Sequence, residues 1–157
     1  MKKYIKITPE GTRDLLFEEC IARRNLETIL GTVFSERGYH EVVTPGLEYY
    51  DVFSLGSAGI PQEVMYKLSD HKGRLMTLRP DNTLPIARLT ATRLQNEPKP
   101  IRLYYTQTVY RSHPSLTGRS DETMQTGIEL LGKSGKRADL EAIAVASGFN
   151  PEGGTRN

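Results

Sequence analysis

IRLYYTQTVYR (residues 101–111) and ETMQTGIELLG (residues 122–132) carry most of the architectural information in this chain of 157 residues. Both segments are rich in β-branched and aromatic residues, a composition typical of β-strands. A polar stretch that contains Pro114 and Gly118 lies between them, as expected for a loop that reverses the chain. We therefore predict that the two segments form a long antiparallel strand pair.

The second of these strands has two different faces, because side chains alternate between the two sides of a strand. One side presents an amide, a gap without a side chain and a carboxylate, namely Gln125, Gly127 and Glu129. On the first strand, Arg111 ends the face to which Gln107 belongs. Such a face is either solvated, as in many antiparallel sheets, or the floor of a small-ligand site. In the second case Gly127 admits a ligand, Glu129 accepts from an ammonium group and Arg111 binds a carboxylate or phosphate.

LRPDNT (residues 78–83) presents the same choice where a strand gives way to a helix. As structure alone, Arg79 pairs with a nearby acid, and Asp81 or Thr83 caps the helix. As chemistry, Asp81 and Thr83 supply acceptors for a cationic ligand group. Combined with a glutamine and a glutamate on a neighbouring strand, these acceptors predict an amino-acid pocket.

A long helix is predicted near the N-terminus. Thr12 is its N-cap, apolar residues recur at helical spacing as far as about Arg37, and Gly38 ends it. This spacing places Cys20 on the apolar side of the helix, in the core.

The same signals predict further elements on either side of the central strands. They are helices over residues 83–94 and 137–147 and a hairpin with strands over residues 64–68 and 75–78. The predicted class is therefore α+β.

Charge and composition exclude several kinds of protein. The formal net charge is +2 with no run of lysines or arginines, whereas a nucleic-acid groove needs clustered basic residues. The single cysteine excludes an internal disulfide and fits a reducing compartment. No apolar run approaches the roughly 20 residues of a membrane span, and the N-terminus lacks a signal-peptide core. The histidines are dispersed without metal-ligand spacing, so we expect a cytoplasmic protein with no metal or cofactor.

Several segments follow one another along the chain in a recognisable order. They are PEGTRDLL, the long first helix, VVTPGLEYYDVF, MYKLSDHKGRLMTLRPDNTLPIAR and the two strands. This order resembles the catalytic core of histidyl-tRNA synthetases. It is more similar still to the synthetase-like regulatory subunit of ATP phosphoribosyltransferase, the first enzyme of histidine biosynthesis. The resemblance runs from about Thr8 to Leu140. It implies the N-terminal part of a class II aminoacyl-tRNA synthetase fold, an antiparallel sheet flanked by helices, with dimerisation through the first helix and the segment around Pro45.

The resemblance also implies a histidine site. In such synthetases an acid and a threonine of an LRPEGT motif and a glutamine on the later strand hold the histidine ammonium group. The corresponding residues here are Asp81, Thr83 and Gln125. Arg111 and Glu129 fall on family positions that line the histidine and adenylate pocket. These five residues are the predicted histidine-binding set.

The nucleotide half of the pocket departs from the synthetase pattern. Asn82 stands where a glycine is usual, and Ser112-His113 replace a His-Glu pair whose glutamate helps bind ATP. Thr123 stands where an aromatic ring stacks on adenine. The resemblance therefore favours a non-catalytic regulatory subunit. It would bind histidine and form a homodimer. This homodimer would join the short-form catalytic subunit of ATP phosphoribosyltransferase in a hetero-oligomer and mediate feedback control. The alternative is a divergent or truncated histidyl-tRNA synthetase that forms histidyl-adenylate.

The resemblance also sets the expected domain organisation. Residues 1–140 are predicted to form the synthetase-like core, truncated at its C-terminal side, and residues 141–157 a helix end and a polar tail. Both relatives continue into strands that carry another ATP-binding arginine and a further histidine-contacting motif, and nothing after Leu140 resembles these.

Overall fold

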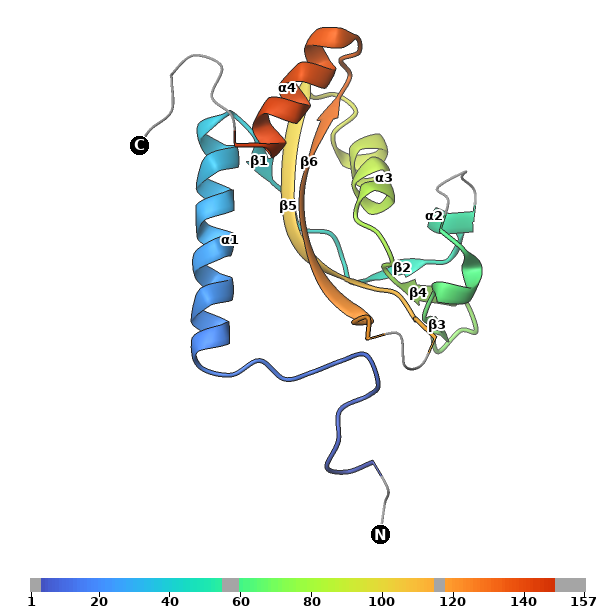
Figure 1. The fold of residues 1–157 in the computed structure, drawn as a ribbon. Helices are drawn as coiled ribbons and strands as arrows, with labels where there is room; N and C mark the ends of the chain where they lie inside the picture. The colour runs from blue at the N-terminus through green and yellow to red at the C-terminus, as the bar shows by residue number, and fades with distance from the viewer. Residues whose placement is uncertain (1–3, 55–59, 115–117, 149–157) are drawn as a thin grey trace.

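The structure, a computed structural model, describes residues 4–54, 60–114 and 118–148. Two long strands, β5 (Ile101–Tyr110) and β6 (Glu122–Leu131), form a curved antiparallel ribbon. Helix α1 (Glu18–Glu36) lies on one side of this ribbon and α3 (Thr83–Arg93) on the other (Figure 1). The other elements are β1 (His40–Glu41), β2 (Leu47–Tyr49), α2 (Asp51–Ser54), the 3-10 helix η1 (Gln62–Val64), β3 (Lys67–Ser69), β4 (Leu75–Leu78) and α4 (Lys136–Ala146). The predicted α+β class and the antiparallel pair are confirmed.

The strands form two three-stranded sheets. One has the order β1-β5-β6, with β1 parallel to β5, and the other is the antiparallel sheet β2-β4-β3. In the β5–β6 register, Gln107 lies opposite Gln125 and Tyr105 lies opposite Gly127. Side chains that face each other in this way project to the same side of the sheet, so the polar face of β6 adjoins the buried face of β5.

Strand β5 separates two apolar clusters. Its buried residues alternate with half-buried ones along its whole length, as expected for a strand covered more fully on one face. On the α3 side, Ile86 packs with Leu103 and Tyr105. On the α1 side, Phe34 contacts Tyr104 at a ring-centroid distance of 5.5 Å. Helices on both faces therefore hold the ribbon in place.

The predicted start of the first helix is wrong. The Thr12 hydroxyl donates to the carbonyl of Pro9 (2.7 Å) and closes a turn instead of capping a helix. The helix begins at Glu18, after Phe17, whose φ of 44° lies in the left-handed region. Thr12 is thus engaged with the preceding turn, and the chain runs on without helical structure until Phe17 redirects it.

The core position predicted for Cys20 is also wrong, because its side chain is exposed. Periodicity identified the apolar side of α1, but only Phe34 of this helix is buried. Three apolar side chains nearer its N-terminus are more than half exposed, namely Ile21, Leu26 and Ile29. No other described element covers this part of the helix.

The remaining boundaries lie close to the predictions. Strand β4 matches residues 75–78, α3 matches to within a residue, and α4 covers 136–146 against the predicted 137–147. The first hairpin strand is shifted to β3, because Val64 belongs to η1. The tail over residues 149–157 lies outside the described residues. Among the described helices, none has the length and apolar character to cross a membrane.

A buried network centred on Arg79 joins the two sheets. The Arg79 side chain lies 8% exposed just after β4. Its guanidinium donates to the carbonyls of Thr44 (2.6 Å) and Thr108 (2.6 Å) and to Oε1 of Gln107 (3.0 Å). No carboxylate forms an ion pair with it among the described residues, so the predicted acid partner is wrong, and carbonyl oxygens satisfy the charge instead. Burial lowers the pKa of this guanidinium from its ordinary value.

Gln107 extends this network toward α3. Its Oε1 accepts from the backbone N–H of Thr44 (2.7 Å), and its Nε2 donates to Oδ1 of Asn82 (3.2 Å). Thr44, Asn82 and Gln107 are all buried. Buried polar groups of this kind are costly when they lose a partner, so the network fixes the position of the β4–α3 junction over β5.

Replacing Gln107 tests this network. Gln107→Leu preserves most of the side-chain volume but leaves Arg79, Thr44 and Asn82 each short of a hydrogen bond. We expect the free energy of unfolding to fall by about 2–4 kcal/mol, measured by urea unfolding followed by circular dichroism. The exposed Gln95 supplies the matched control, Gln95→Leu, which should change stability by less than about 0.5 kcal/mol. Equal stability of the two variants would contradict the role given to Gln107.

An ion-pair cluster between α4 and β5 gives the fold a pH dependence. The Glu141 carboxylate accepts from Arg102 (2.6 Å) and Lys133 (2.9 Å). The hydrogen bond from Arg102, supported by Lys133, lowers the pKa of Glu141 from 4.5 to about 2. Because the folded pKa lies below the unfolded one, the stabilisation is fully present above about pH 4.5 and is lost as the pH falls through about 2.

We therefore expect Glu141→Gln to lower the melting temperature at pH 7, with a loss of stability of about 1 kcal/mol. The difference from the wild type should narrow below pH 4 and vanish near pH 2, as followed by thermal unfolding. Glu63→Gln, at an exposed position in η1, is the control and should match the wild type throughout. A difference for Glu141→Gln that is independent of pH would show that the charge is not the cause.

Candidate functional site

The LRPDNT segment positions Asp81 and Thr83 at the N-terminus of α3. Oδ1 of Asp81 accepts from the backbone N–H groups of Thr83 (2.8 Å) and Leu84 (3.4 Å), so Asp81 caps the first turn. Its other oxygen, Oδ2, lies 3.9 Å from Nη2 of Arg111. The capping role is confirmed, and the second carboxylate oxygen remains directed at a charged neighbour.

Arg111 follows the end of β5 and is held by the backbone. Its Nε donates to the carbonyl of Pro80 (2.7 Å), and 39% of its side chain remains exposed. The pair with Asp81, at 3.9 Å, lies at the upper limit of about 4 Å for an ion pair. The guanidinium is thus anchored at one nitrogen and open to an anionic group at the others.

Gln125 joins the site through Asn82. Nδ2 of Asn82 donates to Oε1 of Gln125 (3.3 Å), and Oδ1 of Asn82 accepts from Gln107. The polar chain from Arg79 through Gln107 and Asn82 therefore ends at Gln125, on the half-buried face of β6. Asn82, which stands where the synthetase motif has a glycine, connects the core network to the candidate site.

Glu129 is the most perturbed acid of the set. It is half-buried on β6, and burial raises the pKa of its carboxyl. A hydrogen bond with the Thr83 side chain lowers this pKa, whereas the charge of Asp81 raises it further. Among the described residues, no lysine or arginine forms an ion pair with Glu129. A half-buried carboxylate without a cation is a suitable acceptor for a positively charged or N–H donating ligand.

The structure thus brings all five predicted residues together. Asp81 contacts Arg111, Thr83 contacts Glu129, and Gln125 is connected to the same junction through Asn82. The polar face of β6 is therefore not simply solvated. It combines two carboxylates, an amide and a hydroxyl with one guanidinium, groups that can pair with both charges of a zwitterion.

The space above Gly127 was predicted to admit a ligand, and this is wrong for the structure as it stands. Tyr105 on the paired strand fills it, because a Cβ on Gly127 would lie 2.5 Å from the Tyr105 hydroxyl oxygen. The sequence analysis assigned no role in the site to Tyr105, Asn82 or Gln107. The alternation along the first strand gave a signal for Gln107 and Tyr105, since it placed both on the face that Arg111 shares.

A hollow of about 290 Å³ adjoins Arg111 and Gln125. His113, Asp121 and Thr123 also line it. Two of the residues that depart from the ATP-binding pattern, His113 and Thr123, therefore lie in one place, beside the predicted amino-acid site. Neither a stacking ring nor the synthetase glutamate is present at these positions.

Asp121 is itself firmly held. Its carboxylate accepts from the Tyr66 hydroxyl and from the backbone N–H of His113 (3.0 Å), and its own N–H donates to the carbonyl of Gly11 (2.7 Å). Gly11 has a φ of 74°, and a Cβ there would lie 2.5 Å from the Asp121 carboxyl carbon. Only glycine fits this approach. The hydrogen bonds from Tyr66 and His113 outweigh burial and lower the pKa of Asp121.

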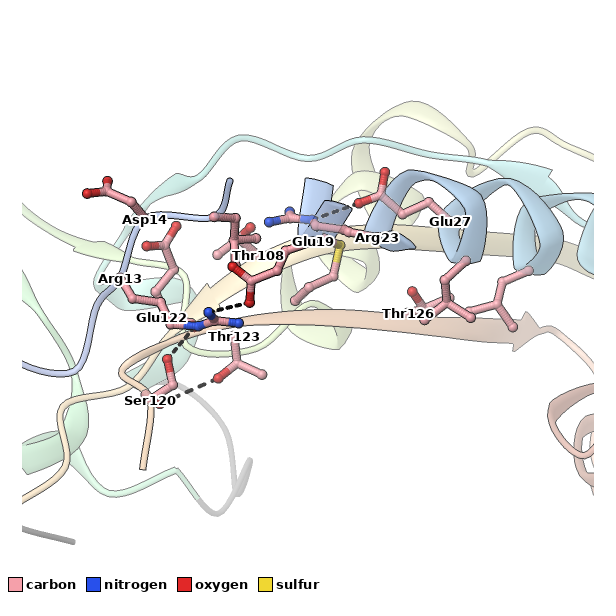
Figure 2. A pocket seen from close by; sticks show the side chains of 14 residues that line it. Arg13, Asp14, Glu19, Arg23, Glu27, Thr108, Ser120, Glu122, Thr123 and Thr126 are labelled. Atoms are coloured by element: carbon pink, nitrogen blue, oxygen red, sulfur yellow. Dashed lines mark hydrogen bonds and ion pairs between the residues drawn. The ribbon is translucent and has the colours of Figure 1, made fainter. Parts of the chain in front are cut away.

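A second hollow, of about 900 Å³, lies on the opposite side of the ribbon, between α1 and the outer faces of β5 and β6 (Figure 2). Four of its charged residues form ion pairs close in sequence, Arg13 with Glu19 (2.6 Å) and Arg23 with Glu27 (2.9 Å). None of the five predicted residues lines it. We place the candidate site on the α3 side, where unpaired acceptors converge, although the hollow there is smaller.

Among the described residues, no group of three or more histidine, cysteine, aspartate or glutamate side chains is arranged to hold a metal ion.

Comparison with known proteins places this geometry in a family. A sequence profile of histidyl-tRNA synthetase matches residues 11–150. The ATP phosphoribosyltransferase regulatory subunit of Clostridium acetobutylicum is 50% identical over 146 residues, which cover 93% of this chain and 35% of that protein.

Solved structures give the same result. A crystal structure described as an ATP phosphoribosyltransferase regulatory subunit/histidyl-tRNA synthetase from Bacillus halodurans C matches with a TM-score of 0.85 and 35% identity, over 94% of this chain and 38% of that one. The apo histidyl-tRNA synthetase of S. aureus matches with a TM-score of 0.76 and 28% identity, over 90% of this chain and 33% of that one. The chain spans about a third of the length of these relatives.

The matched region contains α1, both sheets and every residue of the candidate site. Both the sequence profile and the solved structures cover most of this chain. This chain belongs to the histidyl-tRNA synthetase family, and its homologues at 40–50% identity are named ATP phosphoribosyltransferase regulatory subunits.

Proposed function

We propose that this chain is the synthetase-like part of a regulatory subunit of ATP phosphoribosyltransferase, and that it binds histidine without catalysing a reaction. The observation that carries this proposal is the convergence of Asp81, Thr83, Arg111, Gln125 and Glu129 around one junction. The names of the homologues support the choice of pathway.

Each group has a role in this proposal. Asp81, Thr83 and Gln125 hold the ammonium group, since all three offer acceptor oxygens. Arg111 binds the carboxylate of the ligand, exchanging its long contact with Asp81 for a charge-assisted hydrogen bond. Glu129 accepts from an imidazole N–H, because burial leaves its carboxylate in need of a donor.

The proposal excludes adenylate formation because the neighbouring hollow lacks the nucleotide-binding groups. Thr123 and His113 line that hollow where a stacking ring and a glutamate serve in synthetases.

Regulation then follows from linkage. Histidine inhibits the short-form catalytic subunit of ATP phosphoribosyltransferase only if it binds one conformation of the complex more tightly than another. The exposed apolar side of α1 supports homodimerisation within that hetero-oligomer, because exposed patches of this kind mark interaction sites. The proposed location is the cytoplasm.

Isothermal titration with histidine tests the site. We expect Glu129→Ala to weaken binding about 10- to 100-fold and Gln125→Ala about 3- to 10-fold, since the first removes a charged and the second a neutral hydrogen-bonding group. Gln95→Ala, at an exposed position away from the site, should bind as the wild type does. Unchanged affinity in both site variants would contradict the proposed pocket.

ATP–pyrophosphate exchange separates the regulator from the synthetase. We expect the protein to bind histidine and to show no histidine-dependent exchange, because the nucleotide side of the pocket lacks its ring and its carboxylate. A histidyl-tRNA synthetase of known activity is the positive control. Histidine-dependent exchange above background would favour the synthetase alternative.

A further inference from the structure

The side chain of Asn82 does not do what its position in the helix favours. Asn82 is the N-cap residue of α3, and its carbonyl accepts from the backbone N–H of Ile86 (3.1 Å). Asparagine is among the best N-cap residues because its side chain usually accepts from the first turn. The Asn82 side chain makes no such hydrogen bond, and Asp81 caps the helix instead. Because Asn82 is fully buried, its amide must be satisfied in another way.

The orientation of the neighbouring Gln107 amide is fixed by groups that can only donate. A guanidinium and a backbone N–H offer no acceptor. Nη1 of Arg79 (3.0 Å) and the backbone N–H of Thr44 (2.7 Å) both meet the same atom of Gln107. That atom must therefore be the oxygen, Oε1, and the other end of the amide is the donor, Nε2.

This order of donors and acceptors passes through Asn82 to the candidate site. Nε2 of Gln107 donates to Asn82 (3.2 Å), so the Asn82 atom that it meets must be the oxygen, Oδ1. The remaining end of the Asn82 amide is Nδ2, which donates to Oε1 of Gln125 (3.3 Å). Because the Arg79 guanidinium keeps its proton, none of the three amides can turn over without losing a hydrogen bond.

We propose that Asn82 is a positioning residue of the amino-acid pocket: it passes the order set by Arg79 to Gln125 and holds the Gln125 oxygen toward the ammonium group of the ligand. This inference rests on the proposed function. An amide oxygen has two lone pairs, of which Asn82 occupies one and the ligand takes the other. A reversed Gln125 amide would present its N–H groups to the ammonium group, so that two donors would face each other.

Asn82→Asp tests this order with almost no change of shape. An ionised carboxylate has no N–H, so Gln125 can bond to it only by turning its own Nε2 inward. We expect the affinity of the full chain for histidine to fall about 3- to 10-fold, measured by isothermal titration. The added negative charge by itself would attract the ammonium group and strengthen binding, so it cannot explain a loss. Asn96→Asp, at an exposed position after α3, is the matched control and should bind as the wild type does.

A second variant and a double-mutant cycle separate this role from a packing role. Asn82→Gly removes the donor without adding a charge, and it should weaken histidine binding about 2- to 5-fold. It keeps the test decisive should Asn82→Asp unfold. In a Gln125→Ala background neither variant should weaken binding further, because the amide that Asn82 orients is absent. A loss that persists at full size in that background, or unchanged affinity in both Asn82 variants, would overturn the inference.

Neutron diffraction from deuterated crystals measures the order of the amides without histidine. The method distinguishes the two ends of an amide, because the nitrogen carries deuterium and the oxygen does not. We expect deuterium on the Asn82 atom that faces Gln125 and none on the Gln125 atom that faces Asn82. The reverse arrangement at this contact would overturn the inference.

The outcomes distinguish this inference from the proposed function. A wild-type protein that does not bind histidine would refute the proposed function, while the deuterium positions would still decide the order of the amides. A wild-type protein that binds histidine, together with Asn82 variants that bind it equally well, would refute the positioning role alone.

Discussion

A buried positive charge satisfied by backbone carbonyls is the constraint from which the geometry of this fold follows. Arg79 cannot be removed from water unless its donors find acceptors. The acceptors come from the segment after β1, from β5 and from the Gln107 side chain. Because Arg79 follows β4 of one sheet and two of its acceptors lie on β5 of the other, the guanidinium ties the two sheets together, and α3 must start at a defined place over β5.

The candidate site is an extension of this network toward solvent. Polar contacts run from the buried Gln107 through Asn82 to Gln125, and then to groups that are progressively more exposed. Such a gradient has a functional benefit, since the inner members rigidify the outer ones while the outer ones remain available to a ligand. At the outer end of this network, the Glu129 carboxylate retains unused acceptor capacity because no lysine or arginine among the described residues forms an ion pair with it.

Much of this could be predicted from sequence, because strand alternation is a strong constraint. Alternation alone assigned Gln125 and Glu129 to one face and placed Arg111 beside them, and the register agrees. Family resemblance then predicted a histidine site at the same residues. The identity of the fold followed from the order of the segments, which the solved relatives match.

Other features depend on contacts that a pattern does not encode. A glycine in a strand signals a close approach without saying what approaches, so Gly127 was assigned to a ligand although Tyr105 fills the space. Periodicity identifies an apolar side of a helix but not its cover, which is why Cys20 was misplaced. The partner of Arg79 was assumed to be an acid, since a lone sequence cannot show that three carbonyls converge on one position.

The contact between Gly11 and Asp121 has a practical consequence for anyone who trims this protein. The segment before α1 is not a free tether, because its carbonyl supplies the acceptor for the Asp121 amide and its missing side chain makes room for the carboxyl. A shortened version that starts after Gly11 would lose both features at once. The turn that leads into β6 would then lose its contact with the segment before α1. Arg111 and His113, which lie beside this turn, would lose the same support.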